Sequence, residues 1–336
     1  MIHLRIVVEP GRTERALELL ERSPSVCNVI FLPGAARHPE GDVVLADVAR
    51  EDASVIISDL KDLGVHHDGA ITIEPIDTQI SDHAAHAIDH APGSPSDAVV
   101  WEEVEARTSE NVELSGVFLA FMVLAGLLAA VGIYQDSAVL IVGAMVVGPE
   151  FGPLAGFCVA LVQRRGALAM RSFTALAVGF PLSILVVYLT VLLFKAVGLF
   201  DDEFSAENHS FSNIISSPDF FAFFIAACAG AAGMLSLSTA KSGALIGVLI
   251  SVTTLLAAAN VGLAAAYRDW DSMTGSIEQL AINLVSIVAA GTAVLAAQRA
   301  LYLRRRAKHM DDPERRAAGL PATPKSRATT RSRPSS

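Results

Sequence analysis

The sequence predicts an α+β protein: an N-terminal ferredoxin-like βαββαβ domain followed by a six-helix polytopic transmembrane domain. Strand and helix patterns alternate over the first eighty residues, whereas long apolar segments dominate the rest of the chain. Hydrophobic residues make up 52% of the chain and the mean hydropathy is +0.48, which is too apolar for an ordinary soluble enzyme. We divide the chain into a cytoplasmic domain over 1–80, a connector over 81–113, a transmembrane domain over 114–303 and a basic, disordered cytoplasmic tail over 304–336.

The first eighty residues carry the pattern of two interleaved βαβ units. Alternating or β-branched apolar residues predict strands, and apolar residues at helical spacing predict helices. The predicted elements are a strand over 2–9, a helix over 12–21, a strand over 26–32 that ends at Pro33-Gly34, a strand over 42–49, a helix over 52–63 and a strand over 70–76. Gly64 follows the second helix and suits its C-cap. The order βαββαβ matches the ferredoxin-like arrangement, which does not by itself indicate a function.

The connector and the tail differ in polarity and charge. Within the connector, 82–90 predicts a short helix, 92–96 is a loop, and 97–113 is charged and compatible with a helix. The tail holds 10 Lys and Arg against 3 Asp and Glu, whereas residues 1–100 hold 7 against 17. The acidic front argues against nucleic acid as a partner. A basic tail is typical of the inner membrane face, so membrane lipid is the expected partner there.

Six apolar segments are each long enough to cross about 30 Å of hydrocarbon. They lie near 115–134, 138–162, 172–197, 219–237, 243–266 and 278–301. Basic residues follow the second, fourth and sixth segments, whereas the loop 198–218 is acidic and has no Lys or Arg. The positive-inside rule then places both termini in the cytoplasm and this loop outside. The strand-like N-terminus is unlike a signal peptide, so we expect a multi-pass protein of the bacterial inner membrane.

The second apolar segment is interrupted in its middle by residues that break helices. The candidate site at this break consists of Gly148, Pro149, Glu150, Gly152 and Pro153. Prolines free backbone groups that must find partners in lipid, and a carboxylate at membrane depth is a functional-site hypothesis by default. Glu150 would bind a cation, carry a coupling proton or meet a cationic substrate. The alternative is a structural bond to a neighbouring subunit or a position at the interface.

Asn260 and Asn283 are two further candidates for binding the substrate or ion, because amide side chains in membrane segments can line a cavity. Residues 137–171 can be laid on 242–276 without a gap, which sets Gly148-Pro149 against Thr253-Thr254. The first and last three spans enter the membrane from opposite sides, as in an inverted 3+3 repeat. Few identities support this alignment, so chance is an alternative. Asparagines also commonly hydrogen-bond one membrane helix to another.

His83, His86 and His90 form a second constellation, since their spacing places three imidazoles on one helix face. No closed metal motif surrounds them, so they are weak candidates and no metal is expected. The chain has no phosphate loop, dinucleotide fingerprint, nucleophile elbow or zinc-protease motif. We therefore expect no cofactor and no enzyme, and an intramembrane enzyme is the least favoured class.

The membrane half resembles the bacterial family catalogued as domain of unknown function 389, a conserved hydrophobic domain. The resemblance runs from about 109 to 303 and rests on Ser109-Glu110-Asn111, Asp136-Ser137-Ala138-Val139, Gly143-Ala144-Met145 with Pro149 and Gly152-Pro153, Asp269-Trp270 and Asn283-Leu284-Val285. Many members carry a similar α/β domain in front. Members more often have an apolar residue at Glu150, and many have a proline pair at Thr253-Thr254. The resemblance implies a fold and no settled activity.

The favoured function is a secondary transporter or channel-like permease for a small solute or ion, with its site at the broken helix over 148–153. The alternative is a non-transporting membrane sensor or scaffold, in which the cytoplasmic domain binds a ligand or partner. An anchor would have no need of Glu150 or of two prolines in a membrane helix. Homo-oligomerisation is expected, because six spans make a small bundle.

Overall fold

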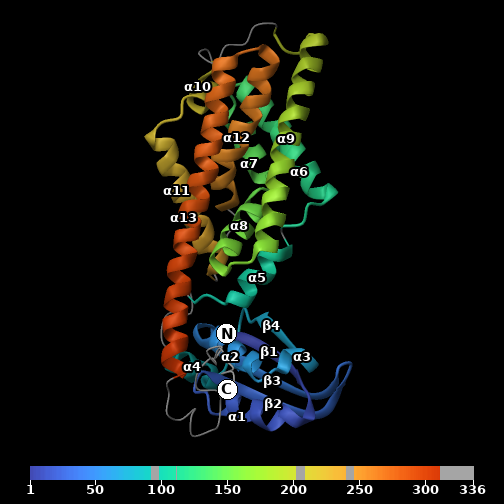
Figure 1. The fold of residues 1–336 in the computed structure, drawn as a ribbon, viewed down its shortest axis with the longest axis vertical. Helices are drawn as coiled ribbons and strands as arrows, with labels where there is room; N and C mark the ends of the chain where they lie inside the picture. Colours follow the sequence, from blue (N-terminus) through green and yellow to red (C-terminus); the bar gives the residue numbers. More distant parts are fainter. Residues whose placement is uncertain (92–97, 111, 202–208, 240–245, 311–336) are drawn as a thin grey trace, which may run out of the picture. The chain divides into compact units, whose positions relative to one another are not determined.

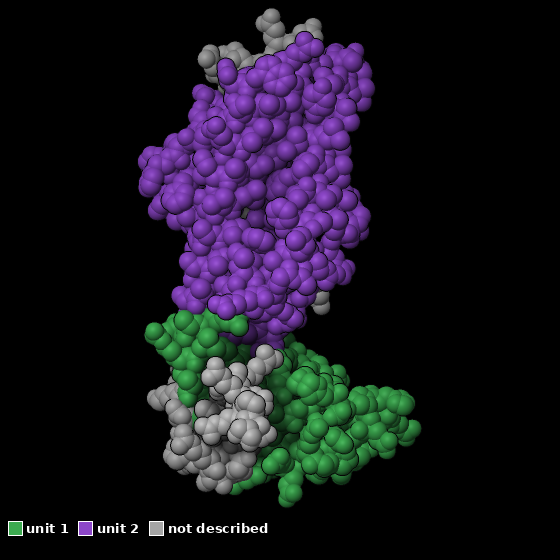
Figure 2. All heavy atoms as spheres, viewed as in Figure 1, with its two compact units in different colours: residues 1–100, 299–336 green, residues 101–298 purple. Residues whose placement is uncertain are grey.

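The computed structural model describes residues 1–91, 98–110, 112–201, 209–239 and 246–310. The predicted tail beyond residue 310 and the start of the fifth predicted span at 243–245 lie outside these residues. The chain forms two compact units (Figure 2). Unit 1 comprises residues 1–100 and 299–336, and unit 2 comprises residues 101–298.

Unit 1 is built on a four-stranded antiparallel sheet with the strand order β2-β3-β1-β4 (Figure 1). Its elements are β1 (Ile2–Val8), η1 (Pro10–Arg12), α1 (Thr13–Glu21), β2 (Val26–Arg37), β3 (Glu40–Val48), α2 (Arg50–Asp62), α3 (Val65–Asp68), β4 (Ala70–Pro75) and α4 (Asp82–His90). Apart from the short η1 and α3, this is the predicted order of strands and helices, and α4 coincides with the short helix predicted over 82–90. Gly64, with φ +77°, ends the second helix as predicted.

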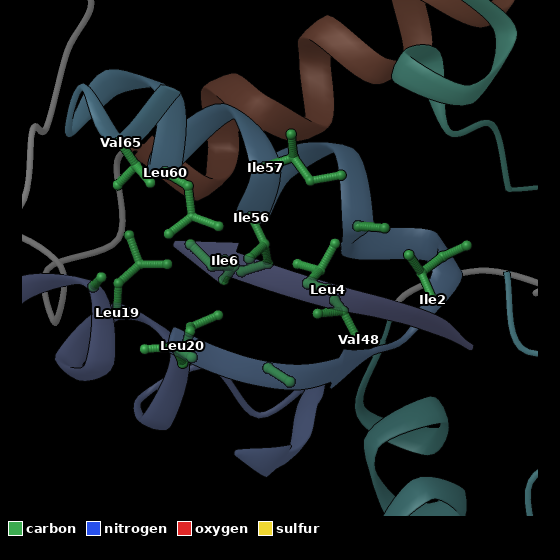
Figure 3. Close-up of a cluster of buried hydrophobic side chains, with 14 of the residues drawn as sticks. Ile2, Leu4, Ile6, Leu19, Leu20, Val48, Ile56, Ile57, Leu60 and Val65 are labelled. Atoms are coloured by element: carbon green, nitrogen blue, oxygen red, sulfur yellow. The ribbon is translucent and has the colours of Figure 1, made fainter. Parts of the chain in front are cut away.

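The core of unit 1 lies between one face of the sheet and helices α1 and α2 (Figure 3). Alternate residues of β1 point into it because side chains of a strand alternate between its two faces. Leu4 pairs with Ala46 of β3 and with Ile73 of β4, so these three side chains lie on the same face of the sheet. Leu20 of α1 and Ile56 of α2 complete the same cluster.

The predicted end of β2 at Pro33-Gly34 is wrong, because the strand continues to Arg37. The register shifts between Leu32 and Ala36, and Gly34 adopts φ +62°. A bulge of this kind absorbs a proline and a left-handed residue without ending the pairing. The Gly34 N–H donates to Oδ1 of Asp42 across the hairpin at 2.7 Å, which replaces the lost ladder bond.

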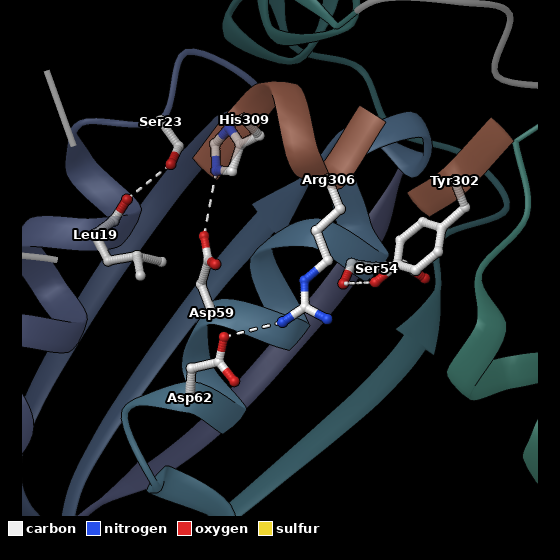
Figure 4. A network of polar contacts seen from close by, with 8 residues as sticks. All are labelled: Leu19, Ser23, Ser54, Asp59, Asp62, Tyr302, Arg306 and His309. Atoms are coloured by element: carbon white, nitrogen blue, oxygen red, sulfur yellow. Dashed lines mark hydrogen bonds and ion pairs between the residues drawn. The ribbon is translucent and has the colours of Figure 1, made fainter. Parts of the chain in front are cut away.

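Residues 299–310, the end of helix α13 (Trp270–Met310), belong to unit 1 and contact α2 (Figure 4). The Tyr302 hydroxyl donates to the carbonyl oxygen of Ser54 at 3.4 Å. Arg306 pairs with Asp62 at 2.9 Å, and Nε2 of His309 lies 3.2 Å from Oδ2 of Asp59. The basic end of the last apolar segment therefore has acidic partners on the sheet domain.

Unit 2 is entirely helical in its described part. The helices are α5 (Trp101–Glu110), α6 (Gly116–Tyr134), α7 (Ala138–Val147), α8 (Phe151–Gln163), α9 (Gly166–Ala196), α10 (Ser210–Ser216), α11 (Phe220–Ser238), α12 (Ile246–Tyr267) and the greater part of α13. Four of them, α6, α9, α11 and α13, are long and apolar enough to cross a membrane. The pair α7 and α8 is bent by 52° and counts as a fifth span if it is one broken span.

The predicted count of six spans therefore becomes four to five among the described residues. The predicted fifth segment, 243–266, overlaps α12, whose described apolar stretch is Thr254–Tyr267. That stretch is too short to span hydrocarbon by itself. Helix α12 passes through Thr253 and Thr254 without a break, so these positions do not mirror the interruption at Gly148-Pro149.

Small residues allow the helices of unit 2 to approach closely. A Cβ at Gly230 of α11 would lie 2.5 Å from the carbonyl oxygen of Ile287 on α13. At the crossing of α6 and α9, the Ser183 hydroxyl donates to the carbonyl oxygen of Met122 at 2.9 Å. Close backbone contact and hydroxyl hydrogen bonds are how helices associate where lipid removes the hydrophobic driving force.

Candidate functional site

The break between α7 and α8 follows from the backbone chemistry of three residues. Pro149 disfavours helical geometry in the residue before it, and Gly148 accordingly takes an extended conformation with ψ 124°. Helix α8 starts after Glu150, so Pro153 falls in the first turn, where a backbone N–H would have no partner within the helix. The predicted interruption of this segment is confirmed as a bent helix pair.

Glu150 lies at the bend and is fully buried. Its Oε1 accepts a hydrogen bond from the Thr254 hydroxyl of α12 at 3.3 Å. The bond joins the broken segment to the position that sequence alignment sets opposite the break. A buried carboxyl group at membrane depth is a functional-site hypothesis by default.

Asn260 lies on α12 less than two helical turns beyond Thr254 and is fully buried. Its Oδ1 accepts from the Ser212 hydroxyl of α10 at 2.9 Å. Its Nδ2 donates to the hydroxyl oxygens of Ser276 at 2.8 Å and of Ser272 at 3.4 Å, both on α13. Asn260 thus ties three helices together, which is the structural alternative considered for it.

A buried polar stripe follows one face of α13, and the sequence reasoning identified only one of its members. The stripe consists of Ser272, Ser276, Gln279, Asn283 and Ser286. The spacing of four, three, four and three residues puts these side chains on one face of a helix. This heptad-like pattern of polar residues in an apolar segment is visible in the sequence and could have revealed the whole stripe.

A cavity of about 670 Å³ opens between α7, α10, α11, α12 and α13. Gln279 and Asn283 of the α13 stripe line it, and Nε2 of Gln279 donates to Oδ1 of Asn283 at 3.3 Å. Ile141 and Met145 contribute apolar wall from α7, the helix that leads into the break. The volume is typical of sites for small organic molecules.

Helix α10 closes part of this cavity and is fixed by polar contacts at its start. The Phe211 N–H donates to Oδ1 of Asp136 at 3.2 Å, and Ser212 binds Asn260. Phe211 and Ile215 then face the cavity. Asp136, which follows α6, therefore holds α10 rather than capping α7, whose N-cap residue is Ser137.

The predicted site residues lie in three neighbouring arrangements rather than one. Asn283 lines the cavity, Asn260 belongs to the serine network, and Gly148, Pro149, Glu150, Gly152 and Pro153 form the bend. Helix α12 links the three, since Thr254 contacts Glu150, Leu256 and Ala257 line the cavity, and Asn260 anchors the network. Sequence reasoning missed Gln279 and Asp219, both of which line the cavity.

His83, His86 and His90 are exposed on α4, and Nδ1 of His90 lies 2.7 Å from the carbonyl oxygen of His86. Within the described part of the chain, no three His, Cys, Asp or Glu side chains gather as they would around a metal ion. A separate hollow of about 700 Å³ between α8, α9 and α13 has almost only apolar walls, as suits a surface in contact with lipid.

Comparison with known proteins agrees with this architecture and adds no activity. The family described as "Domain of unknown function (DUF389)" matches residues 145–289, from the end of α7 into α13. The uncharacterized protein MJ0678 of Methanocaldococcus jannaschii is 27% identical over 195 residues, or 56% of this chain and 58% of that protein. The alignment thus spans less than two thirds of that relative. No solved structure matches the chain. Residues 145–289, which hold the bend, Asn260 and the α13 stripe, are therefore the part of the chain that is similar to the DUF389 family.

Proposed function

We propose that this protein is a secondary transporter or channel-like permease that carries a small solute through the helical unit. The observation that supports this proposal most strongly is the buried polar stripe of α13, because its members Gln279 and Asn283 line a solute-sized cavity beside a broken apolar helix. A membrane anchor has no need of amides that line a cavity, because each polar group at membrane depth must be satisfied inside the protein. A solute pathway needs them.

Glu150 would serve as the site of the coupling proton or cation. It touches α12 through Thr254, and the same helix forms a wall of the cavity at Leu256 and Ala257. Thr254 lies within about one helical turn of Leu256 and Ala257. A proton or cation at Glu150 and a solute in the cavity would therefore both act on the same short stretch of α12. Broken helices beside a central site are a common design among secondary transporters.

We infer six spans, with α12 as the fifth span in chain order and both termini in the cytoplasm of the cell. Arg164 and Arg165 end α8, whereas Asp136, Asp201 and Asp219 mark the ends of α6, α9 and α11 that would face outward. This segregation of charge supports the orientation. The sheet order β2-β3-β1-β4 supports a ferredoxin-like fold for unit 1.

A second candidate function is a membrane sensor or scaffold whose sheet domain binds a ligand or partner. It is favoured by the contacts of Tyr302, Arg306 and His309 with α2, which join the end of the last apolar helix to the sheet domain. The two functions are compatible, since a regulatory domain can act on a transporter. Homo-oligomerisation also remains a proposal.

The test is flux through the full chain reconstituted in liposomes, measured by solid-supported membrane electrophysiology with panels of amines, neutral solutes, carboxylates and inorganic ions. We expect saturable flux of one class, lowered at least about tenfold in Glu150→Gln. Glu113→Gln is the matched control, because Glu113 is exposed and pairs loosely with Arg171 at 3.7 Å. No saturable flux of any class, or equal flux in Glu150→Gln, would contradict the proposal.

A further inference from the structure

We infer that the cavity beside α13 binds a small amphipathic organic amine, with its apolar body between α7, α11 and α12 and its amino group directed to Gln279 and Asp219. This inference rests on the proposed function, since it names the class of solute that the cavity would carry. Binding itself is testable without any flux, so the two can fail separately.

The walls of the cavity select a molecule with an apolar body. Ile141, Met145, Ile225 and Leu256 present aliphatic or thioether surface, and Phe221 adds an aromatic ring. An apolar group in such a site is stabilised in proportion to the area it removes from water. A hydrated inorganic ion would gain nothing from these side chains, and hard cations need several oxygen ligands that converge. No such acidic cluster occurs among the described residues.

The side-chain oxygen of Gln279 is a buried hydrogen-bond acceptor that a ligand could reach. Its side chain is 7% exposed, and its Oε1 has no hydrogen-bond partner within the described part of the chain. Nε2 of the same amide is already used, because it donates to Oδ1 of Asn283. A buried acceptor without a partner is destabilising, and a ligand N–H or O–H would remove that cost.

The carboxylate of Asp219 favours a positively charged ligand over a negatively charged one. It is the one charged side chain among the described residues that line the cavity, and it is exposed, as suits a position at the entrance. Its Oδ1 accepts the Ala222 N–H at 2.8 Å and caps α11. A carboxylate here attracts an ammonium group and repels an anion, and the ring of Phe221 can also interact with a cation. An amine satisfies Gln279 and Asp219 together, whereas an alcohol satisfies only one and a carboxylate neither.

The experiment measures binding to the purified full chain in detergent by isothermal titration and thermal unfolding. The probes are phenethylamine, 2-phenylethanol and phenylacetate, which share an apolar body and differ in the polar group. We expect phenethylamine to bind best, 2-phenylethanol about tenfold more weakly and phenylacetate not at all, since one good hydrogen bond or ion pair corresponds to roughly that factor.

Two variants test the residues. Gln279→Leu and Asp219→Asn should each weaken phenethylamine binding about tenfold or more, the second without loss of the α11 cap because asparagine keeps an acceptor oxygen. Gln298→Leu is the matched control on the same helix, because Gln298 binds Ser238 and does not line the cavity. Unchanged affinity in both variants, or equal binding of all three probes, would overturn the inference.

The amine of phosphatidylethanolamine offers the same chemistry, so titrations are repeated in nanodiscs with and without that lipid. Displacement of phenethylamine by the lipid would assign the cavity to a headgroup and overturn the solute assignment. Amine binding that depends on Gln279, without any flux, would support the inference and contradict the transport proposal. Saturable flux that is unchanged in the Gln279 and Asp219 variants would support transport and contradict the inference.

Discussion

The two units differ in the side chains that they bury and expose. In the sheet unit, Leu4 and Ile56 are buried, while ion pairs such as Arg22 with Glu18 lie outside. In the helical unit, Asn260 and Asn283 are fully buried, while Val285 is 68% exposed. The contrast follows from the solvent: water accepts charge and rejects apolar surface, whereas lipid does the reverse. The buried amides of the helical unit therefore mark the part of the chain that needs a functional explanation.

The largest expected effect tests the apolar side of this comparison. Ile56→Ala should destabilise the sheet unit by about 2–5 kcal/mol, since it opens a hole in a packed core. Val285→Ala should cost less than about 0.5 kcal/mol, because its side chain faces outward on α13. Hydrogen exchange of the full chain, followed at β1 and α2 and at α13, measures both. A large effect of Val285→Ala would show that this face packs against protein rather than lipid.

A smaller effect is expected from the polar interior of the helical unit. Asn260→Ala removes the shared partner of Ser212 and Ser276 and should cost about 1–2 kcal/mol. Thermal unfolding in detergent provides the measurement, with the exposed Gln135→Ala as the control. If both variants unfold at the same temperature, the buried network around Asn260 contributes no stability, and buried polar groups do not distinguish the helical unit in this respect.

The contacts between α2 and residues 299–310 should contribute less. Arg306→Ala removes the ion pair with Asp62, both of whose side chains are partly exposed, so the loss should stay below about 1 kcal/mol. The exposed Arg304→Ala is the control. Faster hydrogen exchange confined to α2 in Arg306→Ala is the expected result. Exchange that is unchanged in a double-mutant cycle with Asp62→Asn would show that the pair is energetically neutral.

The smallest effect concerns a surface carboxylate of the sheet unit. The Thr13 hydroxyl, and after it the Gly34 N–H, lower the pKa of Asp42. A lowered folded-state pKa stabilises above the unfolded value, about 3.9, and this contribution is lost as the pH falls through the folded value. Protection of the β2–β3 hairpin should therefore decrease below about pH 4, and less so in Asp42→Asn. A pH response equal in wild type and variant would remove Asp42 as its cause.

The order of strands and helices was predictable because their signals are local. Alternation in β1, the glycine after α2 and the prolines around Glu150 each act within a few residues. The errors have local causes as well: the bulge that carries β2 past Pro33-Gly34 and the helix turns that extend α9 and α13 beyond their apolar cores. An apolar segment predicts the part of a helix that meets lipid and not where its hydrogen bonding stops.

The sequence by itself determined the two-part organisation, the apolar character of the second part and the interruption at 148–153. Only the tertiary structure decided which polar groups meet. Asn260 is occupied by serines from α10 and α13, Glu150 reaches Thr254, and Gln279 is left facing a cavity beside Asn283. Backbone preference is a property of a few consecutive residues, whereas a cavity is formed by side chains from helices far apart in the chain, and its chemistry depends on how those helices pack.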